Sequence, residues 1–141
     1  MSNMYDKALE IATAAHRNQK DKSGEDYIKH PVTVASFVSG EDAKVVALLH
    51  DVLEDTDVTE AELRAIFGDT ITDAVVTMTH KDGEPYMSYI ERVALNPLSK
   101  EVKLADLKHN MDLGRLPAVT DKDIERIEKK YKPALAYLLA H

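Results

Sequence analysis

Residues 43–55 have the sequence AKVVALLHDVLED, in which an almost continuous apolar run meets a cluster of polar groups. Such a run, from Ala43 to Leu53, predicts a central helix that is buried on every side. His50 and Asp51 stand at its end, and a buried aspartate is costly unless it is paired or bound to a metal. The stretch therefore predicts both the centre of a helical fold and a polar site at one end of it.

On both sides of this helix, apolar residues recur at the three- and four-residue spacing of helices, and strand-like alternation is scarce. Pro31 suits a first helical turn, and Gly68 suits the position after a helix end. The predicted helices are one marked by Ala8, Ile11, Ala12 and Ala15, then 30–38, 43–53, 59–67, 69–78, 86–95, 99–111 and 121–139, with a strand as the alternative for 69–78. We expect an all-α, single-domain helical bundle of about seven or eight helices over residues 1–141.

The composition argues against several classes of function. The chain has 141 residues, a net charge of −7 and no cysteine. An acidic chain is poorly suited to wrap a nucleic-acid polymer, which requires a basic face, and the absence of cysteine excludes disulfides and thiol nucleophiles. No run approaches the roughly 18–20 apolar residues that cross a bilayer, and the first ten residues lack a signal-peptide core. We expect a cytoplasmic protein with no membrane partner, and the sequence leaves a homodimer open.

Acidic residues that follow the pair His50-Asp51 indicate a candidate cation site. Glu54 and Asp55 stand at the four-residue spacing that places side chains on the same helix face. Carboxylates this close repel one another, and a cation between them is the simplest relief. Taken alone, however, the pair is better explained as a helix end that runs into an acidic, solvated loop.

Two residues elsewhere in the chain make a metal site a better explanation of the pair than an acidic loop. His30 stands at a predicted helix start, and Asp106 lies among apolar residues of another predicted helix. Singly, they would be a capping histidine and a surface aspartate. Together with the pair they form a set of two imidazoles and two carboxylates: His30, His50, Asp51 and Asp106. Such a set suits a divalent metal, manganese first and iron or zinc as alternatives, with positions open for water and a phosphate oxygen.

Several short motifs stand in an order that one family shares. They are HRNQ at 16–19, KSGEDYIKHP at 22–31, LHDVLEDT at 49–56, FG at 67–68 and VKLAD at 102–106. On these motifs the chain resembles the HD-domain phosphohydrolases, and within them the hydrolase domain of the RelA/SpoT-type alarmone enzymes and their small stand-alone relatives. The resemblance implies an HD-type helical bundle with manganese as the usual metal, held by the four residues named above.

The resemblance also assigns roles to other residues. It implies that Glu54 and Asp55 are the catalytic pair, Glu54 acting on the attacking water and Asp55 assisting it. It places the nucleotide near four residues, which are Lys22, Ser23, Tyr27 and Asn110. We further expect Lys103, with Lys22, to bind the substrate's phosphates. The family reaction is hydrolysis of the 3′-pyrophosphate of guanosine tetra- or pentaphosphate.

Two positions depart from the alarmone-hydrolase pattern. Asp21 stands where an arginine typically stacks on the guanine, and Leu107 replaces a second arginine. An aspartate cannot stack in that way. Two alternatives therefore stay open beside the alarmone hydrolase. One is a phosphohydrolase for another nucleotide or pyrophosphate-containing substrate, and the other is a non-catalytic HD-fold module that binds a nucleotide for regulation.

The remaining histidines, tyrosines and lysines receive structural interpretations. We expect His16 to pack near the site without binding the metal, His80 to lie in a loop, and His109 to lie beside the site or on the surface. The tyrosines at helical spacing, which we interpret as packing groups, are Tyr86, Tyr89, Tyr131 and Tyr137. The lysines interpreted as a solvated helix face are Lys129, Lys130 and Lys132.

Overall fold

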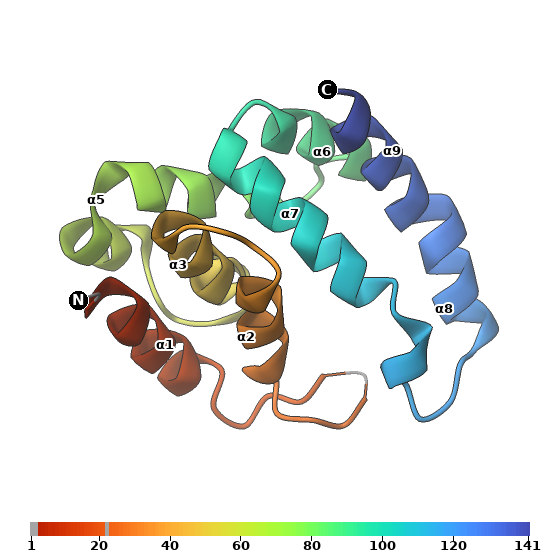
Figure 1. Ribbon diagram of the computed structural model, residues 1–141, viewed down its shortest axis with the longest axis horizontal. Helices are drawn as coiled ribbons and strands as arrows, with labels where there is room; N and C mark the ends of the chain where they lie inside the picture. Colours follow the sequence, from red (N-terminus) through yellow and green to blue (C-terminus); the bar gives the residue numbers. More distant parts are fainter. Residues whose placement is uncertain (1–2, 22) are drawn as a thin grey trace.

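The computed structural model describes residues 3–21 and 23–141, and the elements within these ranges are helical (Figure 1). The described residues contain no strand, only an isolated bridge between Lys20 and Asp26. The α-helices are α1 (Asn3–Ala15), α2 (Lys29–Ser36), α3 (Glu41–Leu49), α4 (Val52–Asp55), α5 (Glu60–Thr77), α6 (Tyr86–Ala94), α7 (Pro97–Asn110), α8 (Asp121–Arg126) and α9 (Lys132–Ala140). A 3-10 turn, η1 (Leu113–Arg115), follows α7, and a π-helical turn, η2 (Ile127–Tyr131), joins α8 to α9.

These elements confirm the predicted all-α fold. Because α8, η2 and α9 are continuous and α4 is a single turn, the described part of the chain has seven helices of eight or more residues. The strand alternative for 69–78 is wrong, since this segment lies in α5. Gly68 divides α5 with a φ of 84° and a ψ of −178°, a conformation that glycine alone adopts readily.

The helix α3 is the centre of the molecule, as its apolar sequence predicts. All of its residues from Val45 to Leu49 are buried, and it packs against α1, α2, α5 and α7. Side chains of these helices form a first hydrophobic cluster, to which α7 contributes Val102 and Ala105. A second cluster joins α6 and α9 to Leu107 of α7. Figure 1 shows α7 running between the two groups of helices, so that one helix serves both clusters.

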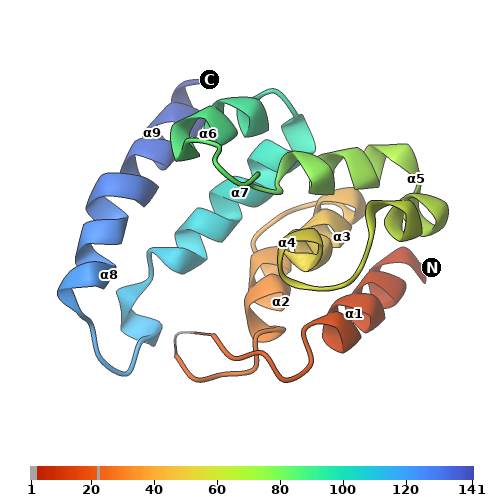
Figure 2. The ribbon, with the colours of Figure 1, turned by 180° about the vertical axis from the view of Figure 1, so that it is seen from behind.

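The predicted central helix ends earlier than expected. It stops at Leu49, and His50 and Asp51 form a turn before α4, with a φ of −106° and a ψ of −2° at Asp51. The imidazole Nδ1 of His50 lies 2.6 Å from the carbonyl oxygen of Ala47. A side chain that binds a carbonyl of the last turn caps a helix end, which gives a physical reason for the stop. The view from behind shows the turn of α4 directly after α3 (Figure 2).

The last long helix bends where its sequence contains a proline. Pro133 has no backbone N–H, so the carbonyl one turn before it loses its usual partner. The helix passes through the π-helical turn η2 at this point and then continues as α9. The interruption of the helix near Pro133 is therefore local, and it places Lys130 and Tyr131 within the widened turn. No helix among the described residues is long and apolar enough to span a bilayer.

The dependence of the fold on α3 can be tested with two leucines. Leu48 is 0 % exposed and Leu95 is 85 % exposed. We expect Leu48→Ala to lower the free energy of unfolding by about 2–5 kcal/mol, because it leaves a cavity in the first cluster. Leu95→Ala should change it by less than about 0.5 kcal/mol. Urea unfolding followed by circular dichroism measures both, and an equal loss in the two variants would contradict the central position of α3.

Candidate metal centre and active site

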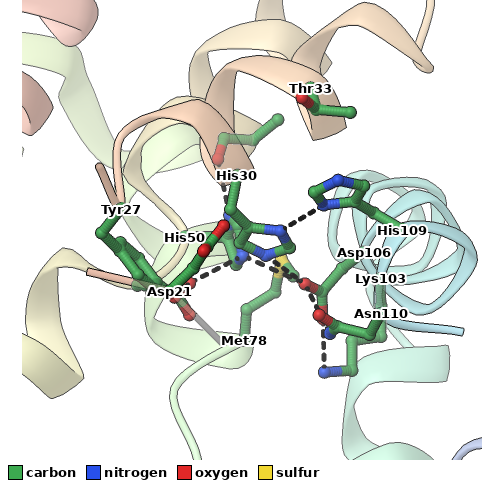
Figure 3. A network of polar contacts seen from close by, with 12 residues as sticks. Asp21, Tyr27, His30, Thr33, His50, Met78, Lys103, Asp106, His109 and Asn110 are labelled. Atoms are coloured by element: carbon green, nitrogen blue, oxygen red, sulfur yellow. Dashed lines mark hydrogen bonds and ion pairs between the residues drawn. The ribbon is translucent and has the colours of Figure 1, made fainter. Parts of the chain in front are cut away.

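Three of the four predicted metal ligands meet in the structure. His30 is the second residue of α2, His50 follows α3 and Asp106 lies on α7. One ligand atom from each falls within 4.8 Å of the others. His30 Nε2 lies 2.8 Å from Asp106 Oδ1, and His50 Nε2 lies 3.4 Å from the same oxygen. All three side chains are buried. Figure 3 shows His30 between His50, Asp106 and His109.

The hydrogen bonding of His50 indicates that a cation fits this cluster. Because a carbonyl oxygen can only accept, the contact with Ala47 places the ring proton of His50 on Nδ1. In the neutral ring, Nε2 then carries a lone pair, yet it lies 3.0 Å from Asp51 Oδ2 and near Asp106. This buried nitrogen has no hydrogen-bond donor. A positive charge is required between these atoms, and a metal ion or a proton supplies it.

The charges of the cluster agree with that requirement. Burial alone would lower the pKa of His50, but Asp51 and Asp106 outweigh it and raise the pKa well above its ordinary value. Burial would likewise raise the pKa of Asp51, but His50 outweighs it and lowers the pKa to about 2. The cluster without metal therefore holds a proton where imidazole and carboxylate meet. A divalent cation that displaces this proton would use the same lone pairs.

The fourth predicted ligand, Asp51, lies at the edge of the cluster. Its Oδ2 is close to His50, but it is not among the three residues whose ligand atoms all approach one another. The hydroxyl of Tyr27 donates a hydrogen bond to the same oxygen. Tyr27, predicted to contact the nucleotide, thus holds Asp51 through its hydroxyl. The ring of His16 is tilted by 45° against the ring of Tyr27, with the centroids 4.8 Å apart, so His16 packs beside the site, as we expected from the sequence.

A histidine outside the predicted ligand set orients His30. His109 Nδ1 lies 2.7 Å from His30 Nδ1, and the two rings stack at 4.9 Å. Burial, with further contributions from His30 and Arg115, lowers the pKa of His109 to about 4. A neutral His109 can accept the Nδ1 proton of His30, which leaves His30 Nε2 free to bind a metal. Such a partner behind a ligating histidine fixes its ring and its tautomer.

On the other side of the cluster, Asp106 is held by two residues of its own helix. Lys103 Nζ lies 2.9 Å from Asp106 Oδ2, and Asn110 Nδ2 lies 3.2 Å from Oδ1. Lys103 is only 8 % exposed, and although burial opposes it, the charge of Asp106 raises the pKa of this lysine well above its ordinary value. Lys103 therefore neutralises the charge at Oδ2 of Asp106, while Oδ1 faces His30 and His50.

A cavity of about 310 Å³ opens onto this cluster. Its lining residues are Lys20, Asp21, Tyr27, His30, Asp51, Tyr86, Lys103, Asp106, Asn110, Arg115, Lys130 and Tyr131. They come from the loop before α2, the first turn of α2, the turn after α3, α6, α7, η1 and η2. The predicted site residues Tyr27, Lys103 and Asn110 thus line one cavity together with three of the four predicted ligands.

The predicted catalytic pair lies on α4 and does not line the cavity. A carboxylate oxygen of Glu54 accepts a hydrogen bond of 3.0 Å from the backbone N–H of His80. Partial burial and the charge of Asp51 raise the pKa of Glu54 and of Asp55. The two carboxylates are therefore close enough to Asp51 for its charge to affect their pKa values, and they lie beside the cluster of His30, His50 and Asp106.

The loop before α2 explains one departure from the alarmone-hydrolase pattern. Asp21 Oδ1 accepts hydrogen bonds from the backbone and hydroxyl of Ser23 and from the backbone of Glu25. Its other oxygen lies 3.6 Å from Nη1 of Arg115. Asp21 therefore shapes the loop, and Arg115 brings an arginine to the same cavity from η1. Ser23, predicted to bind substrate, binds Asp21 and lines a neighbouring cavity instead, and Lys22 lies outside the described residues.

The structure also accounts for Leu107, the second departure from the alarmone-hydrolase pattern, and shows cavity residues that the sequence analysis missed. Leu107 is fully buried in the second cluster and packs there. The cavity residues that the sequence did not indicate are Lys20, Tyr86, Arg115, Lys130 and Tyr131. They lie outside the family motifs quoted above, and most are far from His50 in the sequence. The tyrosines were interpreted as packing groups, which holds for the buried Tyr89 but leaves out that Tyr86 and Tyr131 also line the cavity.

Comparisons with known proteins agree with the motifs. The model of the HD domain matches residues 8–103. A probable guanosine-3′,5′-bis(diphosphate) 3′-pyrophosphohydrolase of Synechocystis is 35 % identical over 94 % of this chain and 19 % of its own length. A guanosine-3′,5′-bis(diphosphate) 3′-pyrophosphohydrolase of Danio rerio is 39 % identical over 76 % of this chain and 67 % of its own length. A probable GTP pyrophosphokinase of Mycobacterium leprae is 36 % identical over 74 % of this chain and 15 % of its own length.

A solved structure gives the same result for the fold. It is described as a metazoan orthologue of SpoT that hydrolyses ppGpp, and it matches with a TM-score of 0.81 and 25 % identity. The match covers 99 % of this chain and 86 % of that one. The chain spans less than a fifth of the Synechocystis and Mycobacterium proteins. Because the HD-domain model covers residues 8–103 and the relatives extend the match along the chain, this protein belongs to the HD-domain family, on its RelA/SpoT-type branch.

Proposed function

We propose that this protein is a divalent-metal-dependent phosphohydrolase that removes pyrophosphate from a nucleotide, with guanosine 3′,5′-bis(diphosphate) as the first candidate substrate. The observation that carries the proposal is the buried His50 Nε2, which has no donor and faces Asp51 and Asp106 in a cluster with His30. The cluster lies on the wall of a cavity that is also lined with cations. The names of the relatives from Synechocystis and Danio rerio support the choice of substrate.

We propose that His30, His50, Asp51 and Asp106 hold the metal, and that manganese is the natural ion. Two imidazoles with two carboxylates suit manganese, whereas a zinc site of structural type would be closed. When bound, such an ion lowers the pKa of a water molecule and polarises a phosphate oxygen. Tyr27 and His109 would keep Asp51 and His30 in the orientation that binding requires.

The remaining residues would bind the substrate and move protons. Glu54 is proposed to take a proton from the attacking water, since its raised pKa lies closer to neutral than that of an ordinary glutamate. Asp55 would assist as its partner. Lys103 and Asn110 would present Asp106 and contact the substrate from α7. Ser23 and Tyr27 would contact it from the loop before α2, and Lys22 is proposed to bind its phosphates. We also propose that residues 1–141 act as one HD domain in the cytoplasm, since α7 contributes to both hydrophobic clusters.

A second candidate function differs only in the substrate. Asp21 occupies the position of a guanine-stacking arginine and forms a loop and an ion pair with Arg115. This arrangement favours another nucleotide or another pyrophosphate-containing compound. A panel of nucleotides assayed with manganese separates the two, because release of pyrophosphate from guanosine 3′,5′-bis(diphosphate) alone would support the first candidate. Metal binding without turnover of any member would favour the regulatory module.

Metal binding itself can be tested through stability. A ligand at one hundred times its dissociation constant stabilises a folded protein by about 2.7 kcal/mol. We expect manganese to raise the melting temperature of protein stripped with a chelator, and Asp106→Asn to lose most of that increase. Asp57→Asn is the matched control, because Asp57 is an exposed aspartate that is not part of the cluster of His30, His50 and Asp106. The proposed site would be wrong if Asp106→Asn gained as much stability from manganese as the control.

The role of Glu54 can be separated from metal binding. We expect Glu54→Gln to reduce kcat by about 10²–10⁴-fold, the usual contribution of a general base, while the stabilisation by manganese is kept. Glu91→Gln on α6 is the control, because Glu91 is exposed on another helix. Steady-state kinetics with the substrate found in the panel gives both values. Wild-type turnover by Glu54→Gln would remove this residue from the catalytic role.

A further inference from the structure

The last helix presents a lysine where its spacing calls for an apolar side chain. Ile127, Ala134 and Leu138 are buried and mark the face of η2 and α9 that packs inward. Lys130 follows Ile127 by three residues and precedes Ala134 by four, so it stands on the same face. A lysine at such a position can cover apolar surface with its stem and keep its ammonium in solvent, and Lys130 is exposed while it also lines the cavity.

The neighbouring lysines do not share this position. Lys129 pairs with Glu125 at 3.2 Å, and Lys132 pairs with Glu128 at 2.6 Å, each one turn back along the outer face. The interpretation of this lysine run as a solvated face therefore holds for these two residues. Lys130 is exposed as well, but it also lines the cavity, which that interpretation leaves out. The π-helical turn contributes to the difference, because Lys130 and Tyr131 both lie in η2 and both line the cavity.

Lys130 lies on the same cavity wall as residues that lead to the cluster of His30, His50 and Asp106. Its Nζ lies 4.6 Å from the centroid of the Tyr86 ring, and Nζ of Lys103 lies 5.9 Å from the same centroid. Lys103 in turn binds Asp106. The ammonium of Lys130 and the lysine that touches a predicted metal ligand therefore both lie against the ring of Tyr86.

Lys130 differs from the other cations of the cavity in its partners. Lys20 pairs with Asp26, Lys103 with Asp106 and Arg115 with Asp21. Among the described residues, Lys130 has no carboxylate at salt-bridge distance, and its Nζ lies over the rings of Tyr86 and Tyr131, at 4.6 Å and 5.9 Å from their centroids. Partial burial, together with the charges of Lys103 and Arg126, lowers its pKa. An ammonium held beside another cation, without an anion of the protein, is suited to an anionic ligand.

We propose that Lys130 binds the outer phosphate of a diphosphate group whose inner phosphate lies at the cluster of His30, His50 and Asp106, and thereby selects diphosphates over monophosphates. This inference rests on the proposed function, since it describes the substrate of the same site. A monophosphate would reach the cluster but not Lys130. A diphosphate would use both, because its second phosphate extends along the wall formed by Lys103 and Tyr86.

The test compares two ligands on two neighbouring lysines. Protein loaded with one equivalent of manganese is titrated with inorganic pyrophosphate and with inorganic phosphate by calorimetry. We expect Lys130→Gln to weaken pyrophosphate binding about tenfold and phosphate binding less than twofold, which is the loss of one charge-assisted contact, about 1.4 kcal/mol. Lys129→Gln should bind both ligands as wild type does, and Lys130→Arg should restore pyrophosphate binding.

Each other outcome overturns the proposal. Equal weakening of both ligands in Lys130→Gln, equal weakening in Lys129→Gln, or no binding of pyrophosphate by wild-type protein would each do so. A variant with a lower melting temperature but an unchanged preference for pyrophosphate would show that Lys130 only packs on Tyr86. Because the titration needs no turnover, an absence of nucleotide hydrolysis would count against the proposed function and not against the role of Lys130.

Discussion

The structure depends on a buried imidazole nitrogen that faces two carboxylates. His50 donates its Nδ1 proton to the carbonyl of Ala47, so Nε2 is directed at Asp51 and Asp106 with a lone pair. Lone pairs and carboxylates do not gather in a hydrophobic interior without a positive charge between them. The same hydrogen bond ends α3 and begins the turn to α4. One contact therefore connects the end of the central helix to the charge of the site and to the position of Glu54 and Asp55.

The fold brings the cluster together because α7 serves two hydrophobic clusters at once. Val102 and Ala105 pack toward α3, while Leu107 packs toward α6 and α9. Asp106 stands between these apolar positions, and burial on both sides holds its carboxylate toward the histidines. Lys103 lies one turn back and compensates the second oxygen. The packing of an ordinary amphipathic helix thus fixes the direction of a proposed metal ligand, without a rigid loop.

Beyond the cluster, the cavity is built from segments that have little in common in the sequence. The loop before α2 is shaped by Asp21, η1 contributes Arg115, and η2 contributes Lys130. The charges in this wall are arranged in pairs, with the exception of Lys130 among the described residues. In this cavity the other cations are paired with carboxylates and Lys130 is not. The positive charge of Lys130 therefore favours a phosphate there, even though the whole chain is acidic.

The sequence by itself determined the all-α fold, the buried central helix and the set of polar residues around His50, because helical periodicity and buried polar residues are local features. It also predicted that the proposed metal ligands lie at the start of α2, at the end of α3 and on α7. Only the tertiary structure decided that His109 supports His30, that Tyr27 holds Asp51, that Leu107 packs in a core and that Lys130 points into the cavity. These relations join residues that are far apart in the chain or that differ only in the face of a helix. They depend on how helices pack, and on the turn after Leu49 and the π-helical turn before Pro133, which no local pattern specifies.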